Sequence, residues 1–463
     1  MIVATSSTPS LFPYQQDTLR FIAEAEGNVI VGHETGVGKT PIAIRYCADN
    51  HLRTLVVCPA SLKRQWQREI QRFAPDRVVC IVNGAPLPDV DFLITNYESL
   101  HRIATNTRLL LSLDAIVLDE AQYIKEYQPG KHGKKHAQSS QRAHLVHTLF
   151  QDVPHKLLLT GTAIKSRPVE LWSLLHFLDP YRWPDPWAYG RRMGLIRSGY
   201  FGVDLKGEGD GLKVNADIKD VYIRYTKAEV RADMPPKLRS ELTFDLRGTD
   251  LAQYRALEKA WLSLKFAHAH LAALARLRHW CADRKVAAIK EYVDTILNGG
   301  QKVVVFSSFR TTLDIAENEW PDAARIDGSC SLGQRDEAVR SFMADDGASV
   351  FLIQTQAGGV GLNLNHPDAQ TCVFLDLPWT PADLMQAEDR IYRITNSNRI
   401  ISVRPVFAGT VEEQVRALLA RKEITLARVL EGRDSLTSEA ETSVLDELVA
   451  HYREGEHGRQ DRH

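Results

Sequence analysis

The segment HETGVGKT, at positions 33–40, has the composition and spacing of a phosphate-binding loop. Glycines let backbone amides turn toward phosphate oxygens, Lys39 can reach the β and γ phosphates of a nucleotide, and Thr40 offers a hydroxyl to Mg²⁺. The strict pattern has glycine at the position of His33, so the loop is less specific than a full P-loop. The residues predicted to bind the nucleotide here are Gly36, Val37, Gly38, Lys39 and Thr40.

A second motif, AIVLDEAQ at 115–122, supplies the carboxylates that such a loop lacks. Four apolar residues lead into Asp119 and Glu120, which places both carboxylates at the carboxyl end of a predicted strand, where open α/β sheets bind ligands. Asp119 would belong to the coordination shell of the Mg²⁺ ion. Glu120 would orient and deprotonate the attacking water. A charge pair at a helix N-terminus is the alternative, and the P-loop upstream disfavours it.

Two further segments could complete a nucleotide site. Gln15 lies just upstream of the P-loop strand, and its amide could pair with both edges of adenine; the start of an amphipathic helix after Pro13 explains the segment equally well. In QAEDRIYR, at 386–393, the spacing predicts Gln386, Arg390 and Arg393 on one face of a helix. An arginine that reaches across a cleft can neutralise transition-state charge on a phosphoryl group.

The elements that must position these residues form two series of alternating strands and helices. From residue 28 to about 179, apolar runs such as NVIVG, TLVVC, AIVLDE and KLLLTGT alternate with helix-like stretches, which is the pattern of a parallel sheet. The pattern breaks between 183 and 279, and a second series begins at KVVVFSS. The predicted fold class is therefore α/β, with two P-loop lobes built on parallel sheets and a helical insertion between them.

Composition narrows the classes of protein further. The 463 residues include 57 Lys and Arg against 58 Asp and Glu, so any site for a polyanion must be local. None of the six cysteines forms a C-x-x-C pair, which favours reduced thiols and a cytoplasmic location. No apolar run approaches the ~18 residues needed to span a bilayer, so we expect no membrane partner.

The motifs, taken in order, resemble those of the superfamily-two helicase-like motors, and within them the Swi/Snf-type DNA translocases. The matching segments are PYQQ, HETGVGKT, VVCPASLKRQW, ITNYESL, LDEAQYIK, LLLTGTAIKSRPVELWSLLHFLDP, MPPK, VVVFSSF, RIDGSCSLGQR, QTQAGGVGLNL and FLDLPWTPADLMQAEDRIYRI. Without chromo-, bromo- or zinc-modules around the motor, the chain is most similar to the compact annealing-helicase (HARP-like) branch and its bacterial or phage relatives.

The resemblance implies an ATP hydrolase in which two RecA-like lobes couple turnover of ATP and Mg²⁺ to stepping along DNA. It implies a first lobe at 1–200, an interlobe connection with a helical insertion at 201–280, a second lobe at 281–430 and a polar, partly disordered tail at 431–463. We expect the protein to act in the cytoplasm, at the nucleoid or in the cytosol of a phage host. A protein partner could direct it to its target.

The same resemblance assigns roles to individual residues. The first-lobe ATP site would comprise Gln15, Gly36, Gly38, Lys39, Thr40, Asp119 and Glu120, completed from the second lobe by Gly359, Gly361, Gln386, Arg390 and Arg393. Coupling of ATP state to lobe closure would involve Gln122, Thr160, Gly161 and Thr162. The phosphate backbone of DNA would be followed by Pro59, Ser61, Lys63, Trp66, Thr95, Asn96, Tyr97, Ser307, Thr355 and Gln356.

Three positions depart from the family pattern. His33 replaces an acidic residue, Gln122 stands where histidine is usual, and the sequence after Arg393 reads IT where an Ile-Gly-Gln run is usual. The catalytic groups are retained, so we expect activity. An RNA helicase would use the same cleft, and a non-catalytic clamp or scaffold that binds ATP or DNA is the alternative of another class.

Overall fold

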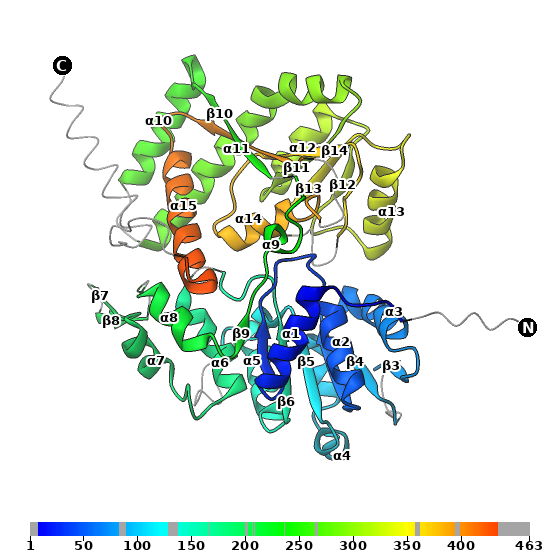
Figure 1. Ribbon diagram of the computed structural model, residues 1–463. Helices are drawn as coiled ribbons and strands as arrows, with labels where there is room; N and C mark the ends of the chain where they lie inside the picture. Colours follow the sequence, from blue (N-terminus) through cyan, green and yellow to red (C-terminus); the bar gives the residue numbers. More distant parts are fainter. Residues whose placement is uncertain are drawn as a thin grey trace, which may run out of the picture. The chain divides into compact units, whose positions relative to one another are not determined.

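The computed structural model describes residues 8–82, 89–127, 138–165, 167–199, 202–205, 207, 209–235, 237–263, 267–356, 362–393 and 399–433. The chain divides into two compact units. Unit 1 comprises Met1–Ala232 and Thr425–Ser435, and unit 2 comprises Asp233–Ile424 and Leu436–His463. Each unit is built on its own parallel sheet (Figure 1).

The sheet of unit 1 has seven strands in the order β3-β4-β2-β5-β6-β1-β9, and every neighbouring pair is parallel. Parallel sheets carry helices on both faces, which explains why β2, β4 and β5 are buried along their whole length. The strands are β1 (Asn28–Val31), β2 (Thr54–Cys58), β3 (Val79–Ile81), β4 (Phe92–Asn96), β5 (Ala115–Asp119), β6 (His155–Leu159) and β9 (Tyr222–Ile223).

Helices cover both faces of this sheet because alternate strand residues point in opposite directions. Leu55 and Val57 pack in one core cluster with Phe150 and Trp172, while Val56 between them is also fully buried. Figure 1 shows α1, α2 and α3 beside one another over the sheet. The helices are α1 (Pro13–Glu24), α2 (Lys39–Asp49), α3 (Lys63–Phe73), α4 (Thr107–Leu111), α5 (Gln138–Phe150), α6 (Leu171–Leu178), α7 (Pro186–Met193), α8 (Gly211–Ile218) and α9 (Lys227–Val230).

Shorter elements complete unit 1. Four 3₁₀ turns span Ala60–Leu62, Tyr97–Arg102, Ala121–Ile124 and Pro168–Glu170, and β7 (Arg197–Gly199) pairs with β8 (Gly202–Asp204) as an antiparallel ribbon. β9 lies in the segment 201–280 that the sequence assigns to an interlobe connection, yet it extends the sheet of unit 1 beside β1. The structure divides that segment, with residues 201–232 in unit 1 and residues 233–280 in unit 2.

The sheet of unit 2 has six parallel strands in the order β10-β15-β14-β11-β13-β12. Val304 and Phe306 of β11 face one core cluster, and Val303 and Val305 face another, so helices cover this sheet on both faces as well. The strands are β10 (Leu238–Phe244), β11 (Lys302–Ser307), β12 (Ala324–Ile326), β13 (Val350–Gln354), β14 (Ala369–Phe374) and β15 (Ile401–Phe407). The two parallel sheets with their helices confirm the predicted α/β fold class.

The helices that begin in unit 2 are α10 (Gly248–Leu262), α11 (Ala267–Asn298), α12 (Arg310–Glu319), α13 (Leu332–Met343), α14 (Pro381–Glu388) and α15 (Val411–Glu431). α15 changes unit along its length, because its residues from Thr425 onward group with unit 1. The tail beyond residue 433, predicted to be polar and partly disordered, lies outside the described residues. Within the part of the chain that the structure describes, no helix has the length and apolar character that crossing a membrane requires.

A buried cluster of charges lies at the end of α14. Glu388 is fully buried and pairs with Lys237, with Arg404 at 3.2 Å and with Arg239 at 3.4 Å. Burial alone would raise the pKa of Glu388, but the three cations outweigh it and lower the pKa to about 2. The glutamate therefore stays ionised and holds β10, β15 and α14 together.

Glu388→Gln should lower the free energy of unfolding by about 3–5 kcal/mol, because Lys237 and Arg404 lose the buried carboxylate that they pair with. The stabilisation from Glu388 is complete above its ordinary pKa of 4.5 and is lost as the pH falls toward 2. Urea unfolding of both proteins between pH 7 and pH 3 measures this, and the variant should lose less stability across that range.

Glu241→Gln is the matched control, because Glu241 forms an ion pair with Arg416 in which both side chains are more than a third exposed. Exposed pairs of this kind contribute about 0–1 kcal/mol. An equal loss of stability in the two variants would contradict the role given to the buried cluster.

Candidate active site

The phosphate-binding loop connects β1 to α2, as the sequence predicts. Gly36 and Gly38 have φ angles of 84° and 72°, a left-handed conformation that glycine adopts without strain. A Cβ on Gly38 would lie 2.5 Å from Nε2 of Gln15, so close packing also requires glycine there. The ammonium of Lys39, the first residue of α2, donates to the carbonyl oxygens of His33 at 2.8 Å and Glu34 at 3.1 Å. The loop thus holds its own lysine at the end of β1.

Residues of α1 pack on this loop. Gln15 is 4% exposed; its Nε2 donates to the carbonyl of Gly38 at 3.1 Å, and its Oε1 accepts from the backbone N–H of Phe12 at 2.9 Å. The hydroxyl of Tyr14 donates to the carbonyl of Val37 at 3.1 Å. The structure therefore brings Gln15 to the predicted site, where its amide supports the loop. Pairing with adenine would exchange one of these two hydrogen bonds.

His33 occupies a fully buried position behind the loop. Its Nδ1 accepts from the backbone N–H of Tyr225 at 3.0 Å, so the ring proton lies on Nε2, which is 2.9 Å from the hydroxyl oxygen of Thr18. Burial, with the charges of Lys39 and Arg224, lowers the pKa of His33 to about 3. The imidazole is therefore neutral near pH 7 and adds no charge beside Lys39.

Asp119 lies at the end of β5, where two donors hold its carboxylate and a third holds its backbone carbonyl. Its Oδ2 accepts from the indole N–H of Trp66 at 2.8 Å, and its Oδ1 accepts from the backbone N–H of Glu120 at 3.0 Å. The hydroxyl of Tyr97 donates to the carbonyl of Asp119 at 2.8 Å. Burial, and then the charge of Glu120, raises the pKa of Asp119, while the Trp66 hydrogen bond and Lys39 lower it.

A chain of hydrogen bonds links Glu120 to the TGT motif. Gln122 donates from Nε2 to Oε2 of Glu120 at 2.6 Å, and its Oε1 accepts from the hydroxyl of Thr160 at 2.6 Å. The hydroxyl of Thr160 also accepts from the backbone N–H of Thr162 at 3.0 Å. A Cβ on Gly161 would lie 2.6 Å from the hydroxyl of Thr35 and 3.6 Å from Nζ of Lys39, so this motif packs against the P-loop.

Glu120 also has an unusual backbone conformation. It is one of three residues other than glycine with positive φ in the described part of the chain, at φ 54° and ψ 53°. Such a conformation costs of order 1 kcal/mol and is typical of functional sites. The turn directs the chain from the buried end of β5 into the 3₁₀ segment that carries Gln122.

The oxygen ligands at this site suit Mg²⁺. Asp119 supplies a carboxylate and Thr40, beside Lys39, supplies a hydroxyl; Mg²⁺ is usually held by one or two protein oxygens together with water and phosphates. Within the described ranges no group of three or more His, Cys, Asp or Glu side chains could hold a metal ion without such partners. The residues present therefore fit a metal ion that arrives with a nucleotide.

The residues predicted to follow the DNA backbone fall into two sets. Pro59 and Ser61, just before α3, and Lys63, its first residue, are at least partly exposed, and Nζ of Lys63 donates to Oδ1 of Asn96 at 3.3 Å. Trp66, Thr95, Asn96 and Tyr97 are instead 0–6% exposed. Direct contact of the Trp66, Thr95 and Tyr97 side chains with a phosphate backbone does not fit this burial, and Trp66 and Tyr97 bind Asp119 instead.

The corresponding residues of unit 2 are similarly divided. Ser307 is buried, and its hydroxyl donates to Oδ1 of Asp376 at 2.8 Å. Thr355 is partly buried and Gln356 is exposed, directly after β13. Gly359 and Gly361 lie outside the described residues.

The arginines of unit 2 are not on the predicted helix face, and that expectation is wrong. α14 ends at Glu388, so of the three only Gln386 is helical. The N–H groups of Arg390 and Ile391 bond to carbonyls three residues back, at 3.1 and 3.2 Å, which closes a tight turn. Arg393 follows this turn, and its NH2 donates to the carbonyl of Leu362 at 2.7 Å.

One part of the site is not predicted by any motif in the sequence. Residues 222–227, from β9 to the first residue of α9, run along the P-loop, and their backbone groups and the side chain of Arg224 hold His33 and Glu34. The available signal was the apolar pair Tyr222-Ile223 before two basic residues, Arg224 and Lys227, but two residues are too short a run to predict a strand.

Two parallel-sheet lobes, a P-loop and a DE motif at the carboxyl ends of two strands on either side of β6, and a paired arginine motif in the second lobe define the class of helicase-like P-loop ATPases. Within that class, a family model described as "SNF2-related domain" matches residues 14–286, and one described as "Helicase conserved C-terminal domain" matches residues 284–395. The chain belongs to the SNF2-related family.

Curated relatives include the mouse protein named DNA annealing helicase and endonuclease ZRANB3, 26% identical over 450 residues that cover 91% of this chain and 41% of that protein. A Caenorhabditis elegans homolog of SWI/SNF-related matrix-associated actin-dependent regulator of chromatin subfamily A-like protein 1 is 28% identical, covering 92% of this chain and 62% of that protein. The chain thus spans about two fifths of the mouse relative's length. The Sulfolobus solfataricus SWI2/SNF2 ATPase core in complex with dsDNA is 24% identical, covers 93% of this chain and 95% of its own, and has a TM-score of 0.43.

Trp66→Phe should lower the rate of ATP hydrolysis about tenfold. The phenyl ring still fills most of the buried space, but Asp119 loses the N–H that fixes its carboxylate, and a hydrogen bond to a charged group contributes about 1.5–3 kcal/mol. Steady-state turnover at saturating ATP measures the effect.

Trp320→Phe provides a matched control, because the Trp320 indole donates to Oδ1 of Asp294 at 3.0 Å in unit 2 and is also buried. The melting temperature should fall by a similar amount in both variants. Equal turnover in wild type and Trp66→Phe, or an equal fall in both variants, would refute the positioning of Asp119 by Trp66.

Proposed function

We propose that this chain is a DNA-dependent ATPase that couples ATP hydrolysis to translocation along DNA. One observation carries the proposal: Lys39, Asp119 and Glu120 lie at the carboxyl ends of β1 and β5 in a chain of the SNF2-related family. Two lobes that close on ATP and relax after hydrolysis would convert turnover into a step along a strand.

The first-lobe residues support a mechanism of positioning and charge stabilisation. Phosphate oxygens would replace the carbonyls of His33 and Glu34 around Lys39, and loop amides at 36–38 would bind the same oxygens. Mg²⁺, held by Thr40 and Asp119, would neutralise the β and γ phosphates. Glu120 orients and deprotonates water, and the amide of Gln122 fixes one of its carboxylate oxygens.

The second lobe would complete the site. Arg390 and Arg393 are proposed to stabilise the transition-state charge, with Gln386, Gly359 and Gly361 nearby in the same motifs. The link from Glu120 through Gln122 to Thr160 supports a coupling role for Gln122 and the Thr160–Thr162 motif, because a change at the γ phosphate would reach that motif through two hydrogen bonds.

DNA is the proposed partner. The exposed start of α3, with Ser61 and Lys63, and residues 355–356 of unit 2 are candidate contacts with the phosphate backbone, so binding should be sequence-tolerant and salt-sensitive. The names of the annealing-helicase relatives support reannealing or remodelling of duplex or forked DNA, and displacement of bound protein would use the same motion. The chain would act in the cytoplasm, where a partner protein could target it.

An RNA helicase is the second candidate within this class, since no described residue distinguishes a 2′-hydroxyl. A clamp or scaffold that binds ATP without turnover is the candidate from another class. Lys39, Asp119 and Glu120 at their expected positions favour an enzyme over the scaffold.

The proposal predicts that duplex or forked DNA stimulates steady-state ATP turnover at least tenfold over the DNA-free rate, and that Lys39→Ala abolishes the stimulated rate. Parallel reactions contain no nucleic acid, single-stranded DNA, duplex DNA, forked DNA or RNA. Raising the salt concentration should weaken activation by DNA steeply, because phosphate contacts release counterions.

Each outcome separates the candidates. Preference for RNA would select the helicase alternative, and no turnover above Lys39→Ala with any nucleic acid would select the scaffold. Stimulation by forked DNA would lead next to strand-annealing assays, which distinguish reannealing from translocation alone.

A further inference from the structure

The segment after β9 forms an outer support for the first half of the P-loop. The N–H of Gly32 donates to the carbonyl of Ile223 at 2.8 Å, and the N–H of Glu34 donates to the carbonyl of Tyr225 at 3.0 Å. The N–H of Tyr225 donates in turn to Nδ1 of His33 at 3.0 Å. The two carbonyls that hold Lys39, those of His33 and Glu34, therefore belong to a strand-like stretch fixed by residues nearly 200 positions later.

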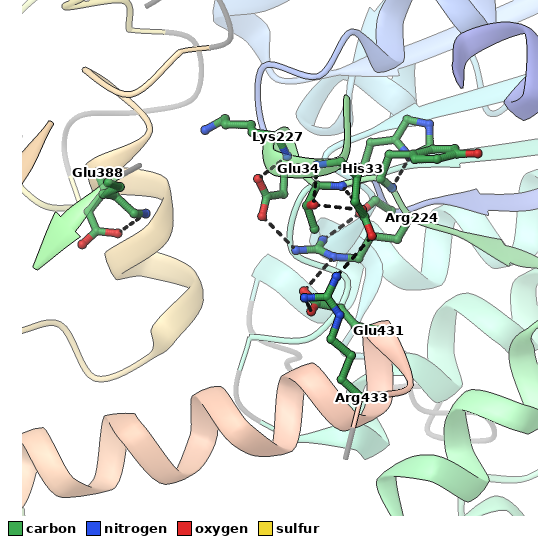
Figure 2. A network of polar contacts seen from close by, with 12 residues as sticks. His33, Glu34, Arg224, Lys227, Glu388, Glu431 and Arg433 are labelled. Carbon is green, nitrogen blue, oxygen red and sulfur yellow. Dashed lines mark hydrogen bonds and ion pairs between the residues drawn. The ribbon is translucent and has the colours of Figure 1, made fainter. Parts of the chain in front are cut away.

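Arg224 lies at the centre of this support, with its side chain 7% exposed (Figure 2). Its NH1 donates to the carbonyl of Gly32 at 2.8 Å, and its NH2 lies 3.6 Å from Oε1 of Glu34. Oε2 of Glu34 accepts from the backbone N–H of Lys227 at 2.9 Å. One guanidinium thus binds both the backbone and an acidic side chain of the P-loop.

The remaining side of Arg224 faces the end of α15. Its Nε lies 3.6 Å from Oε1 of Glu431, the last residue of that helix, which puts two carboxylates around one guanidinium. Figure 2 shows Glu34 and Glu431 on either side of Arg224. Arginine keeps its charge at all accessible pH values, so both carboxylates attract it throughout that range.

The end of α15 is itself firmly held within unit 1. Leu426, Val429 and Leu430 are buried in the main core of that unit, and Nδ2 of Asn215 donates to the carbonyl of Val429 at 2.8 Å. Oε2 of Glu431 lies 3.5 Å from Arg433, which also pairs with Glu229 at 3.2 Å. Glu431 is therefore a fixed charge and not a mobile surface group.

We propose that Arg224 and Glu431 are positioning residues of the phosphate-binding loop, which set the place of Lys39 from the last turn of α15. Without Glu431, Arg224 is drawn toward Glu34 and away from the carbonyl of Gly32, and the His33 and Glu34 carbonyls shift with it. The consequence is weaker binding of nucleotide phosphates. This inference rests on the proposed ATP site.

The test is binding of N-methylanthraniloyl-ADP to the full chain, followed by fluorescence, with the steady-state KM and kcat for ATP as a second readout. Glu431→Gln should raise the Kd and the KM at least fivefold while kcat stays within twofold. Irreversibly unfolded protein does not change the Kd, and a circular dichroism melt of each variant confirms that the remaining protein is folded at the assay temperature. A role in stability alone would lower the apparent kcat and leave Kd and KM unchanged.

Glu423→Gln is the matched control, since Glu423 lies two turns earlier on α15, is similarly exposed and pairs with Arg239 at 3.1 Å. It should leave the Kd within twofold of wild type. The double variant Glu34→Gln/Glu431→Gln should be less impaired than the product of the single effects, because both carboxylates act through Arg224.

Two results would overturn the inference: an unchanged Kd in Glu431→Gln, or an equal rise in Glu423→Gln. Either would leave the proposed function standing, because wild type would still bind the nucleotide. Failure of the wild-type chain to bind N-methylanthraniloyl-ADP would overturn both.

Discussion

The nucleotide site of unit 1 depends on the position of one ammonium group, and several elements of the unit serve to fix that position. Lys39 is held by the carbonyls of His33 and Glu34, so it is only as well placed as the backbone that carries them. That backbone cannot fix itself, because Gly36 and Gly38 give the rest of the loop its freedom. Side chains from α1 and the segment after β9 both support the loop. A phosphate-binding loop with flexible glycines therefore requires contacts from rigid elements in distant parts of the chain.

The same principle applies to the acidic half of the site. A buried carboxylate needs donors, and Asp119 obtains them from Trp66 on α3 and from the peptide of Glu120, while Tyr97 fixes its carbonyl. Trp66 and Tyr97 belong to the two segments that the family resemblance assigns to DNA. Lys63 begins the helix on which Trp66 lies one turn later. The segments proposed to approach DNA and those that position the proposed metal ligand are thus the same elements, so the proposed coupling between the two functions needs no additional element.

Local sequence patterns predict much of this structure. Continuous apolar runs predicted β2, β5 and β11, and the glycines, lysine and acidic pair predicted the P-loop and the end of β5, because these signals lie within a few residues of one another. The partners of those residues lie much farther away: 53 positions separate Trp66 from Asp119, and 192 separate Arg224 from Gly32. No periodicity in a single sequence records such pairs. The early end of α14 could not be predicted either, because the spacing of Gln386, Arg390 and Arg393 fits a longer helix equally well.

Hydrogen bonds explain two of the three departures from the family pattern, those at His33 and Gln122. His33 is neutral, and each ring nitrogen faces a complementary backbone or hydroxyl group, so the substitution brings no charge to the loop. Gln122 donates to Glu120 and accepts from Thr160 through one amide. A neutral histidine offers the same pair of functions, one nitrogen donating and the other accepting, but it loses the acceptor when it is protonated. Glutamine keeps both at every pH. The hydrogen-bond chain from Glu120 to the TGT motif therefore has one donor and one acceptor at residue 122. It does not depend on the protonation state of that residue.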